Sequence, residues 1–302
     1  HVRDELGVGG CGNVLLCARV RSGAVCKREL SAIKVVLPGG GAARITQRVR
    51  RRLESEAAVM HRVSDLHVMR LRDHDCAADL SSFWLVMEYT PSSVSLQHVL
   101  FDRKSLPESE CVTVGLHILR GMRAIHAMGV THRNIKPDNI LRIPISGGPG
   151  EGDAEIQPAE TYVYQIIDFG TAIGAGLEAE DVMLSHSPKV EALAGTLPYM
   201  SPEMFVNGGS GAHFHSDLWA LGVTLFQARC GKLPFVAPNP SPALYCATIS
   251  GPREAPDLRD MTPESDPVSA EFALVVSTAL RKKLRERFAT TVDMILALRT
   301  LR

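Results

Sequence analysis

The sequence predicts an α+β protein with two lobes, a strand-rich first part followed by a helix-rich second part. Three observations predict it. Before about residue 90 the apolar stretches are short and bounded by glycine, as in strands. After that point the apolar residues recur at helical spacing. Apolar residues make up 45% and charged residues 22% of the 302 residues, which suits one large two-lobed domain, or two small ones, with a proper core.

The composition excludes several classes of protein. The chain carries 33 basic and 33 acidic residues, and this balance argues against binding to nucleic acid or to an anionic membrane. No apolar run approaches the ~18 residues that span a bilayer. Seven cysteines without a Cys-x-x-Cys pair fit a reducing compartment, so we expect an intracellular, cytoplasmic protein. The chain begins with His1 rather than Met, and we take it as a fragment that can lack targeting regions.

The first lobe is expected to be a β-sheet with one helix. Glycines alternate with apolar residues at the start, a buried strand follows, and the glycine run at 39–41 ends it. A helix with a basic outer side comes next, and two further strands complete the lobe. In chain order these elements are expected over residues 5–20, 32–36, 44–63, 66–76 and 83–89.

The second lobe is expected to be mainly helical. Apolar residues recur at helical spacing over 108–128, 216–230 and 268–302. Residues 142–164 are rich in Gly, Pro and Glu and predict a surface insertion, either a solvated linker or a partner site. Residues 174–192 are polar and acidic and predict a mobile loop.

A glycine motif opens the chain. The residues Gly7-Val8-Gly9-Gly10-Cys11-Gly12-Asn13-Val14 fit the pattern G-x-G-x-x-G-x-V. Glycines let a backbone approach phosphates closely, although this pattern also occurs in plain turns. In a dinucleotide-binding fold the glycines would open a helix, whereas here a strand-like stretch follows. The sequence therefore favours a glycine-rich hairpin that lies over a nucleotide.

Lys34 lies inside the buried strand of the first lobe. A buried lysine needs a partner because an unpaired buried charge is costly, and the alternative is an edge lysine whose ammonium reaches water. At 100° per residue, Glu56 shares a helix face with Leu53, whereas Glu54 points away. We therefore expect a Lys34–Glu56 ion pair that holds a phosphate-directed lysine.

Four further motifs follow in a fixed order. They are Thr131-His132-Arg133-Asn134-Ile135-Lys136-Pro137-Asp138-Asn139-Ile140-Leu141, then Ile166-Ile167-Asp168-Phe169-Gly170, then Gly195-Thr196-Leu197-Pro198-Tyr199-Met200-Ser201-Pro202-Glu203, and Ser216-Asp217-Leu218-Trp219-Ala220-Leu221-Gly222. With these motifs the chain resembles the eukaryotic protein kinase family over essentially its whole length. The resemblance implies one bilobal kinase domain over 1–302, with an N-lobe at 1–89, a C-lobe at 90–302 and an activation segment at 168–203.

The resemblance also implies ATP with Mg²⁺ as the cofactor, bound between the two lobes. Lys34 would hold the α- and β-phosphates, and Glu56 would orient Lys34. Eight further residues would bind the rest of ATP. They form the glycine lid over the phosphates (Gly7, Gly9 and Gly12), the two faces around the adenine ring (Val14, Ala32 and Leu141), the gatekeeper (Met87) and the first hinge residue (Glu88).

In the second lobe the resemblance implies that Asp168 and Asn139 bind Mg²⁺, an ion that prefers hard oxygen ligands. Lys136 would steady the γ-phosphate, and Thr196 would hydrogen-bond the catalytic loop. Lys136 followed by Pro137 is similar to the Ser/Thr form of that loop.

Several residues are implied to support the site. Glu203 would pair with Arg287, and Asp217 would anchor a regulatory stack. The members of this stack, for which ordinary core packing is the alternative, would be Met60, Leu71, His132 and Phe169.

The catalytic loop departs from the family pattern at one position. The family has His-Arg-Asp, whereas this chain has His132-Arg133-Asn134. An amide keeps the shape of the aspartate but is a very poor proton acceptor, and losing a positioned base typically costs ~10²–10⁴ in rate. Three explanations remain open: a natural pseudokinase that signals through its ATP-bound shape, a slow but real kinase, or an engineered change or sequencing error. Because the rest of the catalytic set is present, we favour an ATP-binding kinase domain with weakened chemistry.

Regulation by phosphorylation is also implied. Arg133 directly precedes the catalytic position. In this respect the chain resembles kinases that are activated by loop phosphorylation, in which the phosphate pairs with this arginine. Ser185 and Ser187 are the candidate phosphorylation sites, and Ser187-Pro188 suits a proline-directed kinase.

The expected partner is a protein substrate or a signalling partner, and nucleic acid is not expected. One basic cluster predicts a solvated helix face, with an anionic partner as the alternative. Its members are Arg44, Arg48, Arg50, Arg51 and Arg52. The sequence leaves the oligomeric state open.

Overall fold

The computed structural model describes residues 1–9, 12–22, 24–38, 42, 44–145, 161–169, 172–174, 195–205, 214–239 and 241–301. The chain forms two compact units. The first comprises His1–Ser64 with Val68–Pro91, and the second comprises Asp65–His67 with Ser92–Arg302. Ser185, Ser187, Gly10, Cys11 and much of the expected activation segment lie outside the described residues.

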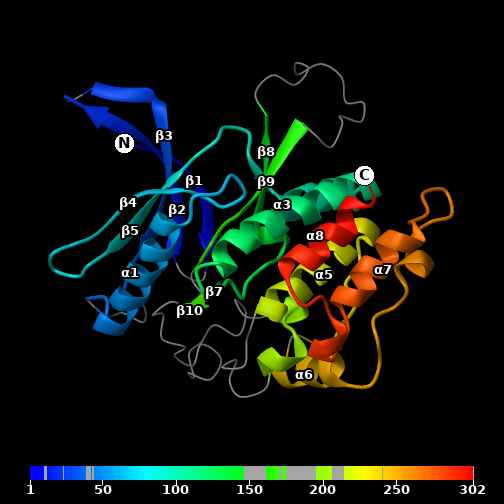
Figure 1. Ribbon diagram of the computed structural model, residues 1–302. Coiled ribbons are helices and arrows are strands. Elements are labelled where there is room, and N and C mark those ends of the chain that lie inside the picture. The colour runs from blue at the N-terminus through cyan, green and yellow to red at the C-terminus, as the bar shows by residue number, and fades with distance from the viewer. Residues whose placement is uncertain are drawn as a thin grey trace. The chain divides into compact units, whose positions relative to one another are not determined.

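The first unit is an antiparallel five-stranded sheet in the order β1-β2-β3-β5-β4, with one helix (Figure 1). Its elements are β1 (Val2–Gly9), β2 (Gly12–Arg21), β3 (Ala24–Val36), α1 (Gln47–Arg62), β4 (Leu71–Cys76) and β5 (Phe83–Glu88). This confirms the predicted sheet with one helix. Strand alternation puts Ala32, Lys34 and Val36 on the buried face of β3.

The helix α1 begins later than the sequence pattern predicts, at Gln47 rather than at residue 44. The side chain of Thr46 accepts a hydrogen bond from the Val49 backbone N–H, and this N-cap fixes the first turn. The predicted inward face is confirmed, since Leu53 and Glu56 are both buried.

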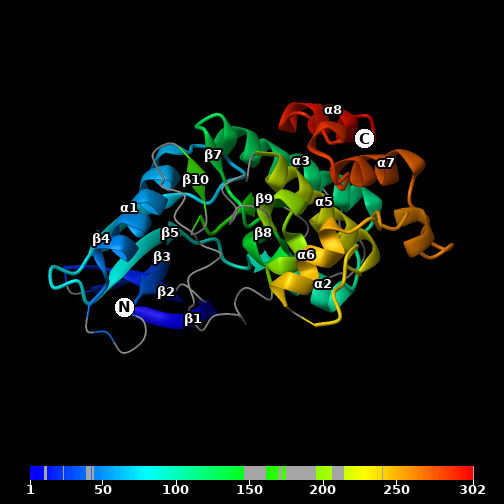
Figure 2. The same cartoon turned by 90° about the horizontal axis from the view of Figure 1, so that it is seen from below.

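The second unit is mainly helical (Figures 1 and 2). Its helices are α2 (Leu96–Arg103), α3 (Glu108–His126), α5 (Phe214–Cys230), α6 (Pro242–Ser250), α7 (Ala270–Ala279) and α8 (Thr291–Arg299). One small sheet has the order β6 (Val94–Ser95), β8 (Ile140–Pro144) and β9 (Tyr162–Ile166), and another pairs β7 (Val130–Thr131) with β10 (Ile173–Gly174). Within the described parts of the chain, no helix is long and apolar enough to cross a membrane.

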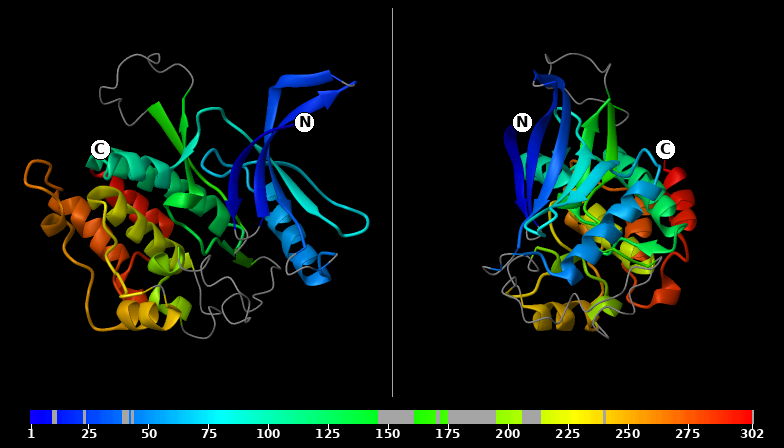
Figure 3. Two further views of the ribbon diagram at one scale, coloured as in Figure 1. Left: turned by 180° about the vertical axis from the view of Figure 1, so that it is seen from behind. Right: turned by 90° about the vertical axis from the view of Figure 1, so that its left-hand side faces the viewer.

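The core of the second unit is built around α5. Trp219 is fully buried and stacks on Phe235 with ring centroids 5.6 Å apart. Gly222 allows α7 to approach closely, because a Cβ there would lie 2.8 Å from the Cβ of Ala279. Figures 1 and 3 show α8 lying along α3.

The surface insertion expected over 142–164 begins and ends as strand. Arg142–Pro144 continue β8, residues 162–164 open β9, and Pro144 pairs with Tyr162 in the register. The Ile145 backbone N–H donates to the carbonyl of Thr161 at 2.8 Å and brings the two ends together. The sequence pattern did not indicate these short strands, because Gly, Pro and Glu dominate the composition of residues 142–164 as a whole. Residues 146–160 lie outside the described part of the chain.

Candidate active site

Lys34 and Glu56 form the predicted ion pair. The Lys34 Nζ atom lies 3.0 Å from Glu56 Oε1, and the two side chains are 9% and 3% exposed. Strand β3 supplies the lysine and α1 supplies the carboxylate. The helical phase places Glu54 away from the buried face of the helix, and this residue pairs on the surface with Arg50 at 2.7 Å. The helical phase thus identified the correct glutamate.

The glycine motif forms the predicted hairpin. Strand β1 pairs antiparallel with β2, Gly7 lies opposite Val14, and Gly9 lies opposite Gly12. Gly12 has a φ of +136°, and a Cβ there would lie 2.4 Å from the carbonyl oxygen of Val35. Only glycine fits this position.

The other residues predicted to contact ATP in the first unit occupy neighbouring positions in the sheet. Val14 pairs with Lys34 between β2 and β3. Ala32 pairs with Met87 between β3 and β5, and Glu88 is the next residue of β5. The sheet register therefore gathers these positions along one short stretch of three adjacent strands. Their roles in binding ATP stay predictions.

The second unit holds the remaining predicted site residues. The Asn139 side-chain amide donates to the backbone carbonyl of Asn134 at 2.9 Å. The backbone carbonyl of Asn139 accepts a hydrogen bond from the Ile167 N–H at 3.0 Å, immediately before Asp168. Leu141 follows Asn139 by two residues in β8. The two predicted metal ligands thus come from segments that are directly hydrogen-bonded to each other.

Asn134 keeps its side-chain oxygen unused. Among the described residues, the buried Asn134 Oδ1 atom has no hydrogen-bond partner. Buried polar groups are nearly always paired, and each exception calls for an explanation.

Thr196 hydrogen-bonds the catalytic loop, as the resemblance implies, and its partner there is Lys136. The Lys136 Nζ atom donates to the Thr196 hydroxyl at 3.1 Å. Thr196 directly precedes the short 3₁₀ helix Leu197–Tyr199 and is separated from Lys136 by 60 residues of sequence. This hydrogen bond links the catalytic loop to the segment that leads into the Leu197–Tyr199 helix.

Asp217, at the start of α5, anchors the catalytic loop. Its carboxylate accepts the backbone N–H groups of His132 at 2.9 Å and Arg133 at 2.7 Å. Burial alone would raise the pKa of Asp217, but the hydrogen bond and charge of His126 and the bonds from the loop together lower it. The carboxylate is therefore ionised at neutral pH.

Two loop residues adopt the left-handed backbone region. Arg133 has a φ of +67° and Asp168 a φ of +65°. Such non-glycine conformations cost about 1–3 kcal/mol each and are found where a site requires them.

The His132 ring meets the Phe169 ring edge-on, with centroids 4.9 Å apart, and burial lowers the pKa of His132. The neutral His132 ring thus packs against Phe169, the residue that follows Asp168.

Glu203 and Arg287 form the second predicted ion pair. Two guanidinium nitrogens of Arg287 reach the two carboxylate oxygens of Glu203 at 2.7 and 2.9 Å. The Arg287 side chain is fully buried, and its guanidinium lies 4.8 Å from the Trp219 ring centroid. Burial tends to raise the pKa of Glu203, but Arg287 outweighs this effect and lowers it.

The sequence reasoning missed two polar residues of the second unit. His126, at the end of α3, places Nε2 2.8 Å from Asp217. Glu110 accepts the Tyr164 hydroxyl at 2.6 Å and is paired with Arg103 at 2.8 Å. A buried acidic residue inside an apolar helical pattern was the only available signal for Glu110.

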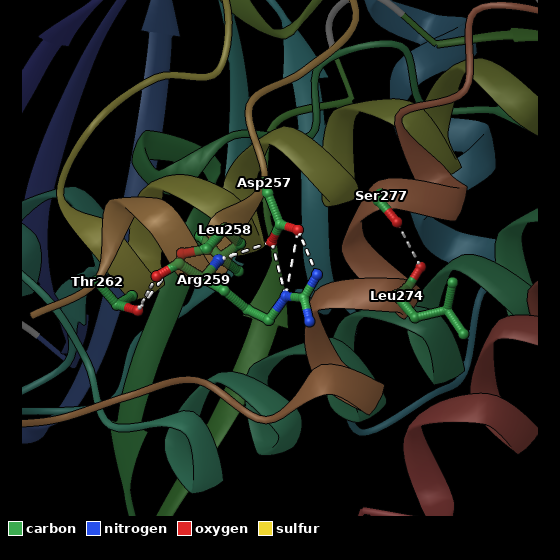
Figure 4. Close-up of polar contacts among 6 residues, drawn as sticks. All are labelled: Asp257, Leu258, Arg259, Thr262, Leu274 and Ser277. Carbon is green, nitrogen blue, oxygen red and sulfur yellow. Dashed lines mark hydrogen bonds and ion pairs between the residues drawn. The ribbon is translucent and has the colours of Figure 1, made fainter. Parts of the chain in front are cut away.

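A pocket of about 390 Å³ lies elsewhere in the second unit, between α7 and the segment around Asp257. Figure 4 shows polar contacts around it, between Arg259 and the carboxylate of Asp257 and between the Ser277 hydroxyl and the Leu274 carbonyl. The shortest Arg259–Asp257 hydrogen bond is 2.7 Å long. None of the predicted site residues lines this pocket, and its charged side chains are exposed. It is therefore separate from the candidate active site.

Two features define the fold of a protein kinase. The sheet unit holds a buried Lys34–Glu56 pair, and the helical unit has a loop whose backbone is bound by Asp217. The chain belongs to the protein kinase domain family, whose pattern residues 1–297 match.

Curated relatives support this assignment. The chain is 32% identical over 287 residues to the probable serine/threonine-protein kinase PkwA of Thermomonospora curvata, covering 91% of this chain and 33% of that protein. It is 26% identical over 284 residues to the probable serine/threonine-protein kinase KCC4 of Saccharomyces cerevisiae, covering 94% and 24%. A serine/threonine-protein kinase of Drosophila persimilis is 29% identical over 206 residues, covering 68% and 24%. The chain thus spans a third or less of the length of these relatives.

Proposed function

We propose that this chain is a single serine/threonine protein kinase domain that binds Mg-ATP and transfers the γ-phosphate to a protein hydroxyl, with chemistry weakened by Asn134. The observation that carries the proposal is the buried 3.0 Å Lys34–Glu56 ion pair. A lysine in a buried strand, held by a carboxylate from the only helix described in the first unit, suits a fixed positive charge for phosphates.

Serine and threonine are the proposed acceptor residues. The relatives that match most of the chain are named serine/threonine-protein kinases. The Lys136–Thr196 hydrogen bond supports the same choice, because both residues belong to the Ser/Thr form of these segments.

Asp168 and Asn139 are proposed to hold Mg²⁺. Carboxylate and amide oxygens are the hard ligands that this ion prefers, and the backbone bond between Asn139 and Ile167 brings the two segments together. When bound, Mg²⁺ neutralises charge on the phosphates. The Lys34 ammonium would bind phosphate oxygens, and glycines such as Gly7 and Gly12 would let the backbone approach the phosphates closely.

Asn134 is proposed to orient the acceptor hydroxyl without removing its proton. Its unpartnered Oδ1 atom can accept a hydrogen bond, but an amide does not take up the proton. Phosphoryl transfer through a loose transition state depends mainly on the metal and on positioning, so slow transfer is compatible with this loop.

The alternative function is an ATP-binding pseudokinase that acts as a signalling scaffold or allosteric partner. One observation favours it, namely the amide at position 134 in an otherwise complete loop. The two functions predict different outcomes for the Asn134→Asp variant, which restores a base only if the rest of the site is competent.

The proposed function is tested by incubating the chain with Mg²⁺ and γ-labelled ATP on a generic basic protein, followed by acid hydrolysis and identification of the labelled amino acid. Label in phosphoserine or phosphothreonine that depends on Lys34 supports the proposal. Absence of label from both the chain and its Asn134→Asp variant, with nucleotide binding retained, would favour the scaffold.

A further inference from the structure

Two histidines lie next to each other in the first unit, one on α1 and one on β4. His61 is in the last turn of α1 and is exposed, and His74 is in the middle of β4. Their ring centroids are 5.4 Å apart and the ring planes are inclined by 60°, so the rings are close without being stacked. Figures 1 and 2 show α1 lying beside β4, with which it is in contact.

The alternation of side chains along β4 places His74 on the inner face of the sheet. His74 and Cys76 are half-buried, whereas Asp73 and Asp75 are exposed. The ring centroid of Phe83, a fully buried residue of β5, lies 6.1 Å from that of His74. The His74 ring therefore has a buried aromatic ring and the exposed ring of His61 as its neighbours.

Nitrogen atoms of both rings are unused. The His74 Nδ1 atom is buried and has no hydrogen-bond partner among the described residues. Over the same part of the chain, the His61 ring makes no hydrogen bond or ion pair. Buried polar groups are nearly always paired, so the His74 nitrogen calls for an explanation. The imidazole nitrogen is the commonest protein ligand for a metal ion.

The spacing of the two rings suits a single metal ion. On a tetrahedral Zn²⁺ with Zn–N bonds of about 2.0–2.1 Å, two imidazole rings have centroids about 5.2 Å apart. The separation of 5.4 Å between His61 and His74 agrees with this value. Because His61 is exposed, its ring can turn to direct a nitrogen at the ion without disturbing the core.

The chemistry of the pair selects the kind of ion. Within the ranges that the structure describes, no third His, Cys, Asp or Glu completes a set of three around the two rings. Two imidazoles with water in the remaining positions suit Zn²⁺, Cu²⁺ or Ni²⁺ rather than Mg²⁺, which prefers oxygen ligands. The pair thus differs in chemistry from Asp168 and Asn139, the proposed ligands of Mg²⁺.

We propose that His61 and His74 form a binding site for a divalent transition-metal ion of the Zn²⁺ class, which links the last turn of α1 to β4. The ion ties the helix that carries Glu56 to the sheet that carries Lys34. The site does not rest on the proposed kinase function, because binding of the ion is measured at the two rings themselves.

The test follows the imidazole nitrogens of the full chain by NMR while Zn²⁺ alone is added at about pH 7.5, since a metal-bound imidazole must be deprotonated. We expect the ring nitrogens of His61 and His74 to shift together along one saturation curve. Half-saturation is expected at about 1–200 µM Zn²⁺, which corresponds to half the binding free energy of a four-ligand structural site.

Two variants each remove one ligand. His61→Ala changes an exposed position, and it should raise the Zn²⁺ concentration for half-saturation at His74 at least about tenfold, because chelation by the second ring is lost. His74→Phe keeps a ring beside Phe83 and should have the same effect at His61. If His74→Phe does not fold, His61→Ala decides.

His98→Ala is the matched control, because His98 is a helical histidine that is 62% exposed and paired with Asp102. It should leave the saturation curve of His61 and His74 unchanged, and Mg²⁺ in place of Zn²⁺ should shift neither ring. Three results would overturn the site: a shift of one ring without the other, an unchanged curve for His74 in His61→Ala, or no shift of either ring up to about 1 mM Zn²⁺.

Discussion

The ammonium of Lys34 and the carboxylate of Glu56 lie 3.0 Å apart, and both side chains are almost completely buried. The two residues are 22 positions apart in the chain and belong to different elements, β3 and α1. Replacing either charged group would remove a charge-assisted hydrogen bond from a buried site, where such bonds are strong. The pair therefore links the orientation of α1 to that of Lys34.

The first prediction concerns this pair. Glu56→Gln should lower the free energy of unfolding by about 1.5–3 kcal/mol, the range for a hydrogen bond to a charged group. It should also weaken the binding of Mg-ATP, because Lys34 loses its orienting partner. Urea unfolding and calorimetric titration with Mg-ATP measure the two effects.

Glu54→Gln is the matched control for this prediction. It is the same substitution two residues away on the same helix, at an exposed i,i+4 pair with Arg50. It should change stability by less than about 0.5 kcal/mol and leave nucleotide binding unaltered. Equal effects of the two substitutions would argue against a special role for Glu56.

The second prediction concerns the hydroxyl of Thr196, which accepts a hydrogen bond from Lys136 at 3.1 Å. Thr196→Val removes the acceptor and should lower the transfer rate about tenfold to a hundredfold, as expected for losing a bond to a charged donor. Thr196→Ser keeps the hydroxyl and should stay within about threefold of the unchanged rate. The comparison is best made with Asn134→Asp present, where the signal is larger; similar rates for Val and Ser would contradict the assigned contact.

The third prediction concerns the Glu203–Arg287 pair and its pH dependence. The pKa of Glu203 lies below its ordinary value of 4.5 because of Arg287. Its contribution to stability is therefore complete above pH 4.5 and is lost as the pH falls through the lowered pKa. Glu203→Gln should cost about 3–5 kcal/mol at neutral pH, because Arg287 stays buried without its countercharge.

This cost should shrink in acid, where the unchanged chain loses the same interaction. Urea unfolding at a series of pH values measures the difference between the two proteins. Glu286→Gln, an exposed pair with Lys283, is the control and should be nearly neutral. A stability difference between Glu203→Gln and the unchanged chain that does not depend on pH would contradict the assigned titration.

The contacts that could be predicted from the sequence rest on periodicity or on a motif. The helical phase separated Glu56 from Glu54, and the glycine pattern followed by a strand-like stretch predicted the β1–β2 hairpin. The Glu203–Arg287 pair and a hydrogen bond between Thr196 and the catalytic loop came from the family resemblance, since no local pattern relates residues 84 and 60 positions apart. That the partner of Thr196 is Lys136 was not predicted. Each of these contacts is present.

The contacts that could not be predicted depend on tertiary packing alone. His67 reaches His117 and Tyr164 only because a three-residue segment docks on β9, and no spacing in the sequence indicates this. The Glu110–Tyr164 hydrogen bond spans 54 residues and belongs to no motif. The start of α1 was misplaced because the capping by Thr46, rather than the apolar pattern, determines where the helix begins.

The most direct test of the central claim, that this is a kinase site weakened at one residue, is single-turnover phosphoryl transfer from γ-labelled ATP with Mg²⁺. The chain as it stands is compared with Asn134→Asp, and Asp168→Ala serves as the control. We expect slow transfer that Asn134→Asp raises by about 10²–10⁴, the usual contribution of a positioned base, and that Asp168→Ala abolishes. No transfer in either protein, while both bind Mg-ATP, would contradict this account and favour the scaffold.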